Sequence, residues 1–330
     1  MKEKGATMKI NKKWIIISLA FLLVVTATVG YLCRKQIALM TFDMFLSKQV
    51  EKKLEEAYKP LTIKNPLVQD EPFSVLLLGI DQRDKEIGRS DSMIYSVVRR
   101  KENRILLLSI PRDSYTEIVG KNKQDKIAHA YAFGGAKMSV DSVEHLLQHP
   151  VTHYAAINFT GFKNVVDALG GIELPITKDI VNKNWNHDKF RIEANKPIYN
   201  GLEALNYVRY REDSDMDRMM RNRIFLQAIA ERAVQLDKFS HIPELLGIAG
   251  VHFTTDISPS DMIDLAKSIF MKDTLPQFTT YALDGEGMMK HDIWYYNLDE
   301  GDLAYARELI ANWLDPAVTA EKLMEPRSKK

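Results

Sequence analysis

Hydrophobic and polar positions divide the 330-residue chain into blocks, and the first block differs from all the others. Residues 1–13 contain five lysines and one glutamate, whereas residues 14–33 contain no charged side chain. Twenty uncharged, mostly apolar positions match the ~20 residues that a helix needs to cross the hydrocarbon core of a bilayer. The pattern therefore predicts a transmembrane helix at residues 14–33, preceded by a short basic tail at residues 1–13.

The lysines before this segment also predict its orientation. Positive charge beside a first membrane span tends to remain in the cytoplasm, and only Arg34 and Lys35 follow the span directly. A cleaved signal peptide is the alternative, but its apolar region is usually about 7 to 15 residues long, and no small-x-small cleavage site follows Cys33. We therefore expect a single-pass type II protein of the cell membrane, with its large domain outside the cell.

A helical pattern continues beyond the predicted span. Apolar residues recur at helical spacing through residues 36–58, and prolines at 60, 66 and 72 then interrupt the pattern. We interpret residues 34–70 as a juxtamembrane stalk and linker, residues 71–316 as one globular domain outside the cell, and residues 317–330 as a charged C-terminal tail.

Short apolar runs alternate with amphipathic segments throughout residues 71–316. The runs predict strands at residues 73–80, 93–98, 105–110, 153–159, 172–176 and 278–283. Helices are predicted around 140–147, 162–169, 201–208, 217–236, 259–271 and 302–314, and residues 177–198 are expected to form a loop. A polar turn at residues 100–103 predicts a hairpin. The fold class is therefore α/β, with a mixed β-sheet sandwiched between α-helices in three layers, because strands this apolar need cover on both faces.

The overall charge limits the classes of partner. Lysine and arginine number 45 against 44 aspartates and glutamates, and no helix-turn-helix pattern stands on the short basic tail, so we expect no nucleic acid partner. A binding site for an anion must then come from local clustering of basic residues.

Charged residues gather where predicted strands end. Asp81 ends an apolar run, and the loop after it carries Arg89 and Asp91. Carboxylates at strand ends suit magnesium, which takes one or two of them and completes its shell with water and phosphate, although a solvated turn would look the same. Arg112 follows another strand and could bind phosphate or simply pair with Asp91 or Asp113.

The densest basic cluster surrounds the start of the helix predicted at 217–236. Cations are unfavourable at a helix N-terminus because the helix dipole is positive there, so Arg218 and Arg221 suggest a bound anion. Acidic residues lie among them at Asp215 and Asp217. The whole cluster contains arginines at 209, 211, 218, 221 and 223. It predicts a ligand with two or more negative charges.

Six motifs together resemble the LytR-CpsA-Psr family, the envelope phosphotransferases of mostly Gram-positive bacteria. The motifs are LLLGID ending at Asp81, GRSDSM at 88–93, LLSIPRDSY at 107–115, DKIAHAYAFGG at 125–135, VDALGGIEL at 166–174 and ALNYVRYR at 204–211. The resemblance implies transfer of a glycopolymer phosphate, such as that of wall teichoic acid, from an undecaprenyl pyrophosphate carrier to peptidoglycan. It also implies a mixed sheet between helices with an apolar channel for the prenyl chain.

The same resemblance assigns roles to individual residues. Asp81 and Asp91 would hold Mg²⁺, or Mn²⁺ in its place, and Asp91 is our first choice of general base. The catalytic group would be Asp91 with the arginines at 89, 112, 209 and 211. The pyrophosphate would be bound by Arg89, Arg112, Lys126, Arg209, Arg211, Arg218 and Arg221.

Two positions depart from the family pattern. Asp217 stands where the family has glycine, so either Asp215 or Asp217 takes the family's acidic position. Asn222 replaces a glutamine, which shortens a polar side chain by one methylene. We treat Asp215, Asp217 and Asn222 as supporting residues.

Two other functions share the same residues. A lipid pyrophosphate hydrolase would use water as acceptor, and a non-catalytic membrane-tethered protein would only bind a polyprenyl phosphate or act as a transcriptional attenuator. The expected partners of the transferase are an undecaprenyl pyrophosphate-linked glycan, a peptidoglycan acceptor and the cytoplasmic membrane.

Overall fold

The computed structural model describes residues 34–45, 47–61, 67–68, 70–81, 88–183, 189–210, 215–235, 252–272 and 274–327. The chain divides into two compact units, residues 1–47 and 48–330. In the first unit, the helical pattern of the predicted stalk forms α2 (Arg34–Phe45). Within the described ranges, no helix combines the length and apolar character that crossing a bilayer requires. The span predicted at residues 14–33 lies outside them and stays a prediction.

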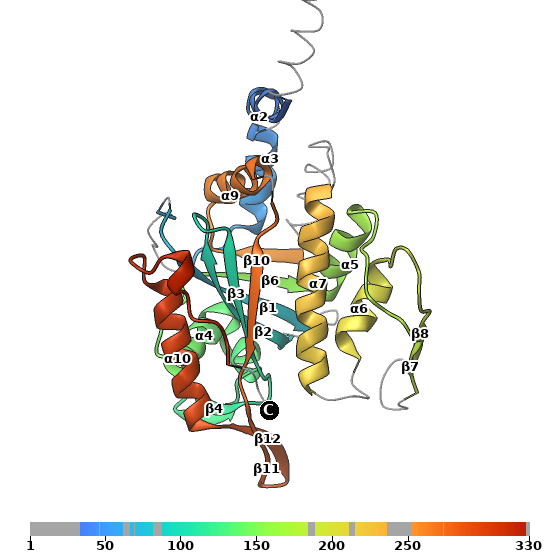
Figure 1. Cartoon of the computed structure of the whole chain (residues 1–330). Helices are drawn as coiled ribbons and strands as arrows, with labels where there is room; N and C mark the ends of the chain where they lie inside the picture. The colour runs from blue at the N-terminus through green and yellow to red at the C-terminus, as the bar shows by residue number, and fades with distance from the viewer. Residues whose placement is uncertain are drawn as a thin grey trace, which may run out of the picture. The chain divides into compact units, whose positions relative to one another are not determined.

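The second unit is built on a six-stranded mixed sheet (Figure 1). Its strands are β1 (Phe73–Asp81), β2 (Arg89–Arg99), β3 (Arg104–Ile110), β6 (His153–Asn158), β9 (Phe253–Thr255) and β10 (Gln277–Ala282), in the order β10-β3-β2-β1-β6-β9. The pairs β10–β3 and β1–β6 are parallel and the other neighbours are antiparallel. The predicted mixed sheet, with a hairpin between its second and third strands, is therefore confirmed.

One face of the sheet packs against α4 (His129–Leu147) and α10 (Glu300–Leu314) (Figure 1). Leu76, Leu78 and Leu108 from the strands meet Trp313 in this core, and each of these side chains is almost wholly buried. The segment after α10 closes the core from outside, because Leu323 joins it and the Trp313 indole donates a hydrogen bond to the carbonyl of Met324. We call this side the filled face.

Buried Arg99 fastens the end of α10 to the sheet. Its guanidinium donates to the carbonyls of Trp313, Asp315 and Val318, and it also pairs with Glu102. Hydrogen bonds from its two terminal nitrogens offset much of the cost of burying this charge, and the accepting carbonyls include one that α10 leaves without a helical partner.

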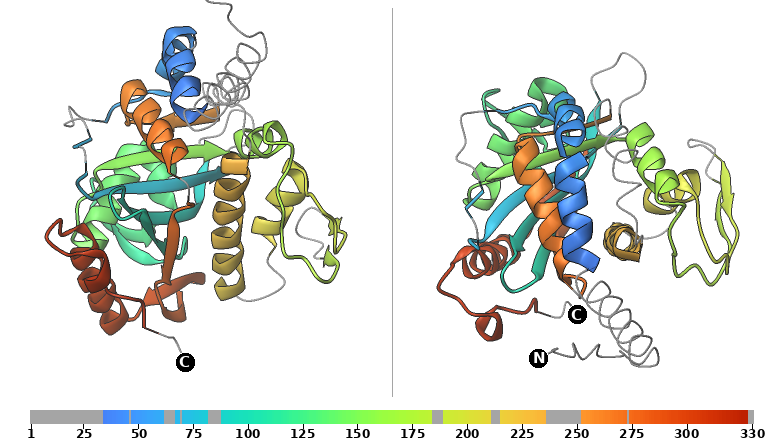
Figure 2. Two further views of the ribbon diagram at one scale, coloured as in Figure 1. Left: turned by 45° about the horizontal axis from the view of Figure 1, so that its top comes forward. Right: turned by 90° about the horizontal axis from the view of Figure 1, so that it is seen from above.

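The opposite side of the sheet carries α5 (Phe159–Ala168), α6 (Gly201–Arg209) and α7 (Asp215–Gln235) (Figure 2). These helices pack on one another through a second cluster that includes Val166, Tyr207 and Ala228. Asn200 begins α6 with a capping box to Glu203. After α5, Gly170 and Gly171 adopt φ values of 72° and 84°, which confirms the predicted glycine end of this helix.

The strand predicted at residues 172–176 is wrong. Only Ile172 makes a β-bridge, to Tyr199, while Leu174 and Ile176 are buried in the cluster of α5, α6 and α7. Their apolar character reflects burial among helices rather than a place in the sheet. The expected loop at 177–198 contains a small ribbon, β7 (Ile180–Asn182) and β8 (Phe190–Ile192).

Several short elements had no counterpart in the sequence patterns. They are β4 (Tyr115–Ile118), β5 (Lys123–Lys126), β9, β11 (Gly285–Lys290), β12 (Ile293–Leu298) and a 3₁₀ turn at Ala320–Lys322. The remaining helices of the described residues are α3 (Ser47–Ala57), which buries Val50, Leu54 and Ala57, and α9 (Pro259–Met271), which Ser258 caps.

Candidate functional site

A β-bulge places Asp91 where the predicted site requires it. Gly79 pairs with Ser92, but the next residue, Ile80, pairs with Ser90, so Asp91 is one extra residue in β2. A bulge of this kind interrupts the alternation of a strand and re-aims its side chains. The interruption lies at the end of the sheet where the predicted metal-binding residues occur.

The bulge changes which face each side chain joins. Ile80 packs in the filled face, and its partner Ser90 contacts the Ala128 carbonyl just before α4. Asp91 and Ser92, although adjacent, both line a hollow on the opposite side of the sheet. Asp81 shares that side by alternation with Leu77 and Gly79, which line the hollow too. Asp81 and Asp91 thus project from the same side at the ends of neighbouring strands.

A continuous set of ion pairs runs from Asp91 across the sheet end. Arg112, just after β3, donates to Asp91 at 2.5 Å and to Asp113 at 3.3 Å. Lys126, the last residue of β5, pairs with the other oxygen of Asp113 at 2.8 Å. The structure therefore brings together Asp91, Arg112 and Lys126, three of the residues predicted from the sequence, and joins them through Asp113.

Charges within this set reinforce one another. Burial raises the pKa of the Asp113 carboxyl, but hydrogen bonds from Lys126 and Arg112 outweigh burial and hold the pKa below its usual range. Burial lowers the pKa of Arg112, but Asp91 and Asp113 more than compensate and raise the pKa above its usual value. Asp113 thus remains ionised and holds two cations beside Asp91.

The hollow lies between the sheet and α5, α6 and α7, with a cavity volume of about 220 Å³. Its wall is apolar, with side chains from all three helices and from β1, β2 and β6, among them Leu77, Ile157, Phe162, Leu205 and Phe225. Asp91, Ser92, Arg209 and Asn222 add the polar groups of its lining. An apolar hollow with a few polar groups is typical of a site for an amphipathic ligand.

Arg209 and Asn222 join the hollow from the helices. Arg209 ends α6 and lies over the ring of Phe159, with 4.5 Å from the guanidinium carbon to the ring centre. The amide nitrogen of Asn222 is 3.5 Å from the Ser92 hydroxyl, at the limit of a hydrogen bond. The shorter side chain at this position therefore still reaches β2.

Arg221 is buried between α6 and α7 and does not line the hollow. Its guanidinium donates to the Tyr210 carbonyl at 2.6 Å and lies 5.3 Å from the centre of the Tyr210 ring. This contact ties α7 to the end of α6, and so fixes the backbone next to Arg209. A direct role of Arg221 in binding pyrophosphate stays a prediction.

The other predicted residues are exposed, or their side chains lie outside the described part of the structure. Arg89 is exposed at the start of β2, opposite Asp81, and Asp217 is exposed in the first turn of α7. Arg211 lies outside the described residues, and only the backbones of Asp215 and Arg218 are described, in α7. Their roles stay predictions.

The donors fit a hard divalent cation. In the described part of the chain, no three histidine, cysteine or acidic side chains gather as a complete metal site. Magnesium needs fewer protein ligands, since one or two carboxylates and substrate phosphate oxygens complete its octahedron. Asp81 and Asp91, on one side of the sheet and beside the arginines, match that requirement.

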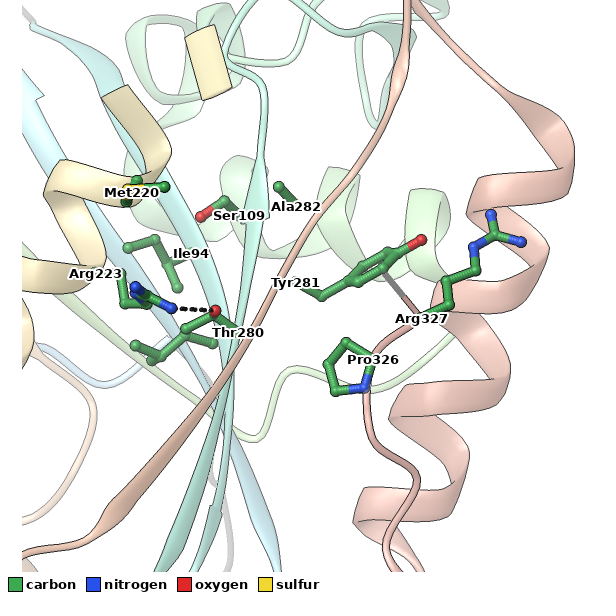
Figure 3. A pocket seen from close by; sticks show the side chains of 10 residues that line it. Ile94, Ser109, Met220, Arg223, Thr280, Tyr281, Ala282, Pro326 and Arg327 are labelled. Carbon is green, nitrogen blue, oxygen red and sulfur yellow. Dashed lines mark hydrogen bonds between the residues drawn. The ribbon is translucent and has the colours of Figure 1, made fainter. Parts of the chain in front are cut away.

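A second, smaller hollow of about 180 Å³ lies on the same side of the sheet (Figure 3). Ile94 lines both hollows, and here it is joined by residues of β10, by Met220 and Arg223 of α7 and by Pro326 and Arg327. Arg223 donates weakly to the Thr280 hydroxyl at 3.4 Å, whereas Arg327 pairs with Asp302 of α10. Arg223, part of the basic cluster in the sequence, thus lies at this second hollow and not at the first.

Sequence patterns missed the residues that join the site together. The sequence indicates Asp113 only as a partner of Arg112, although a carboxylate directly after an arginine at a strand end is the signal that marks it. Phe159 and Tyr210, which lie against Arg209 and Arg221, gave no signal because their places depend on how α5, α6 and α7 pack.

The fold and these residues together define a class of protein. Residues 40–310 match the LytR_cpsA_psr family, and the chain belongs to that family. Its mixed sheet between helices is the architecture of solved relatives. The chain aligns with B. subtilis TagV at 28% identity and a TM-score of 0.64, over 75% of this chain and 99% of that one.

Particular relatives carry a more specific description. The chain is 37% identical to a Bacillus cereus protein named polyisoprenyl-teichoic acid–peptidoglycan teichoic acid transferase TagU, over 76% of this chain and 84% of the relative. A protein of the same name from Enterococcus faecalis is 36% identical, over 82% and 89%. A solved structure described as TagT bound to LI-WTA is 30% identical, with a TM-score of 0.60, over 77% of this chain and 94% of that one.

Proposed function

We propose that this protein transfers a phosphate-linked anionic glycopolymer, of the teichoic acid type, from a polyisoprenyl pyrophosphate carrier to peptidoglycan. The observation that carries the proposal is the apolar hollow between the sheet and α5–α7, whose lining includes Asp91 and Arg209. A lipid chain needs apolar walls, and its pyrophosphate needs cations beside them. Relatives with the corresponding transferase name share more than a third of their aligned residues with this chain.

The hollow separates the two ends of such a substrate. The prenyl chain would lie against Leu77, Ile157 and Phe225, where apolar burial stabilises it by about 25 cal/mol for each Å² removed from water. Its pyrophosphate would then meet Arg209 within the hollow and Arg112 beside Asp91. Guanidinium groups suit this task because their fork of donors matches phosphate oxygens.

Magnesium is the cofactor we propose, with Mn²⁺ as a substitute. Asp81 and Asp91 would hold it, and it would supply positive charge to the pyrophosphate oxygens. Phosphoryl transfer depends mainly on position and electrostatic stabilisation, so the chain needs no covalent nucleophile.

The proposed reaction joins an acceptor hydroxyl to the phosphorus that carries the glycopolymer. The new oxygen–phosphorus bond forms as the bond to the bridging oxygen breaks, and polyisoprenyl phosphate leaves. Asp91 would accept the hydroxyl proton. Arg112, fixed by Asp113, orients the Asp91 carboxylate through the 2.5 Å contact.

We also propose that the chain is a single-pass membrane protein with its domain outside the cell. The support is the basic tail and the uncharged segment at residues 14–33. Protease added to intact protoplasts should digest the domain, whereas a protected domain would overturn both the orientation and the substrate.

The decisive experiment uses the full-length chain in detergent with a synthetic polyisoprenyl pyrophosphate disaccharide, with and without magnesium and soluble peptidoglycan oligomers. Mass spectrometry should find sugar phosphate attached to the oligomer and free polyisoprenyl phosphate. Release of sugar phosphate into solution, at the same rate with and without acceptor, would identify a hydrolase. An intact donor under all conditions would indicate a binding protein.

The sharpest substitution is Asp91→Asn, which keeps the shape of the side chain but removes its charge. We expect transfer to fall by about 10²- to 10⁴-fold, because a general base contributes on that scale, and the magnesium dependence to shift as well. Asp179→Asn is the matched control, since Asp179 is an exposed carboxylate paired with Arg191 in the β7–β8 region. Wild-type turnover by the Asp91 variant would remove Asp91 from the mechanism.

A further inference from the structure

The β11–β12 ribbon exposes an unusually apolar face beside the site. Met289 is 66% exposed and Trp294 is 41% exposed. The two residues are paired across the ribbon, and Tyr296 pairs with Gly287 two positions along, so Met289, Trp294 and Tyr296 share one face. Exposed aromatic surface of this kind commonly marks a place where something binds. We call these three residues the aromatic platform.

Glycine at position 287 fixes the flat side of the platform. A Cβ atom there would lie 2.9 Å from the Trp294 indole nitrogen, so only glycine lets the indole rest against the ribbon. The Trp294 and Tyr296 rings are 6.3 Å apart and tilted by 44°. A ring held in place before binding loses little conformational entropy when a ligand covers it.

Backbone and side-chain contacts tie the platform to the proposed catalytic residues. The Tyr296 amide donates to the Asp113 carbonyl at 2.9 Å, and Tyr296 forms a β-bridge with Ser114. The ammonium group of Lys126 lies 5.9 Å from the Trp294 ring while it pairs with Asp113. Whatever covers Trp294 is thus next to the ion pairs that end at Asp91.

The platform and the hollow lie at different parts of the sheet. The hollow lies over β1, β2 and β6, whereas β11 follows β10, an edge strand on the far side of β3. Figure 1 shows the ribbon projecting past the end of β10. A lipid carrier in the hollow therefore leaves the platform uncovered for a second substrate.

We infer that the aromatic platform binds the glycan strand of the acceptor and brings its hydroxyl toward Asp91. This inference rests on the proposed transferase function. A pyranose ring has a flat side of C–H groups, which are attracted to the negative face of an aromatic ring, and hydroxyls at its edge. Lys126 and the Tyr296 hydroxyl, which contacts Asp284, supply polar groups at that edge.

A membrane surface fits this ribbon less well than a glycan does. The exposed charges of the ribbon are of both signs, since Glu286 and Lys290 lie on the face opposite the platform and Asp292 lies at the turn. The ribbon therefore lacks the cluster of basic residues that binds an anionic lipid surface, whereas the uncharged rings of a glycan need no such cluster.

The test measures binding of short soluble peptidoglycan oligomers to the full-length chain in detergent, by calorimetry and without any lipid donor. Trp294→Ala should weaken binding about tenfold, the scale of one lost stacking contact, while Trp294→Tyr, which keeps a ring, should stay within about threefold of wild type. Ile293→Ala is the matched control, because it removes exposed apolar surface from the other face of the same ribbon. Its affinity should not change.

Transfer kinetics separate this inference from the proposed function. Trp294→Ala should raise the KM for the acceptor and leave the KM for the lipid donor unchanged. If the wild-type protein binds oligomers through Trp294 but transfers no sugar phosphate, the transferase proposal is contradicted and the role of the platform in binding is supported. If wild type and Trp294→Ala both transfer with the same KM for the acceptor, the role of the platform is contradicted and the transferase proposal is supported.

A membrane-bound platform has its own signature. In nanodiscs with brominated lipids, the difference in fluorescence between wild type and Trp294→Tyr isolates the emission of Trp294. Unquenched emission supports a platform in water, whereas strong quenching by the lipids would overturn the inference.

Discussion

The filled face of the sheet buries Leu76, Leu78 and Leu108 beneath α4 and α10, whereas the opposite face leaves a hollow beneath α5, α6 and α7. Both faces are formed by the same strands. The two faces differ in the size of their side chains. On the side of the hollow, the neighbouring strands β1, β2 and β6 carry the small residues Gly79, Ser92 and Ala155. Small side chains there leave the space of the hollow, in which we propose that the lipid chain lies.

This difference shows what an apolar strand does and does not reveal. A strand that is apolar on both faces must be covered on both, but the cover can be protein or substrate. On β1 the two kinds of cover alternate residue by residue, since Leu76 enters the core and Leu77 lines the hollow.

Neighbouring leucines on β1 give the largest expected contrast in stability. Leu76→Ala, in the filled face, should lower the free energy of unfolding by about 3 to 5 kcal/mol, because a buried leucine leaves a cavity that tight packing cannot close. Leu77→Ala should cost only about 1 kcal/mol, because it enlarges a hollow that already exists. Urea unfolding of both variants measures the contrast, and equal losses would mean that the hollow is closed in solution.

Filling the hollow should separate stability from binding. Ala155→Phe places a ring where we propose that the prenyl chain lies, so lipid affinity should fall about 100-fold, on the scale of three or four methylenes excluded from apolar contact. The melting temperature should stay the same or rise. Ala155→Ser, which keeps the volume, is the control, and full lipid affinity in the phenylalanine variant would place the chain elsewhere.

The ion pairs at the sheet end predict a smaller, pH-dependent effect. The folded pKa of Asp113 is lowered, so its stabilising contribution is present above its unfolded pKa of about 3.9 and is lost as pH falls through the lower folded value. Asp113→Asn should cost about 1 to 2 kcal/mol at pH 7 and progressively less below about pH 4. Chemical denaturation across that range measures it, and a pH-independent cost would show that the charge of Asp113 does not matter.

The sequence predicted the long elements well because period and length agree in them. The runs at 73–80, 105–110 and 278–283 are strands, and the amphipathic segment at 302–314 is α10. The run at 172–176 failed because burial among helices produces the same apolar letters as a strand. Ribbons such as β4–β5 and β11–β12 are too short and too exposed to show a pattern.

The sequence predicted which residues belong to the site, but not how they are arranged. Asp91 and Arg112 stand out as charges at strand ends, and they do meet. The bulge that turns Asp91 toward the hollow cannot be seen in the sequence, since simple alternation puts Asp91 on the same face as Met93, in the filled core. Arg221, prominent in the sequence, is buried against Tyr210, because helix packing rather than charge determines where it points.

The packing of residues 320–327 sets an order on the folding of the chain. The cluster of α5, α6 and α7 draws on residues 162 to 229 and can form once α7 has emerged during synthesis. The filled face includes Leu323, and Arg99 donates a hydrogen bond to the carbonyl of Val318. This core is therefore completed only after residues 318–323 have been synthesised. Until then Leu76, Leu108 and their neighbours stay exposed to aggregation and to chaperones. The filled face, which buries the larger core, is therefore the last part of the domain to form.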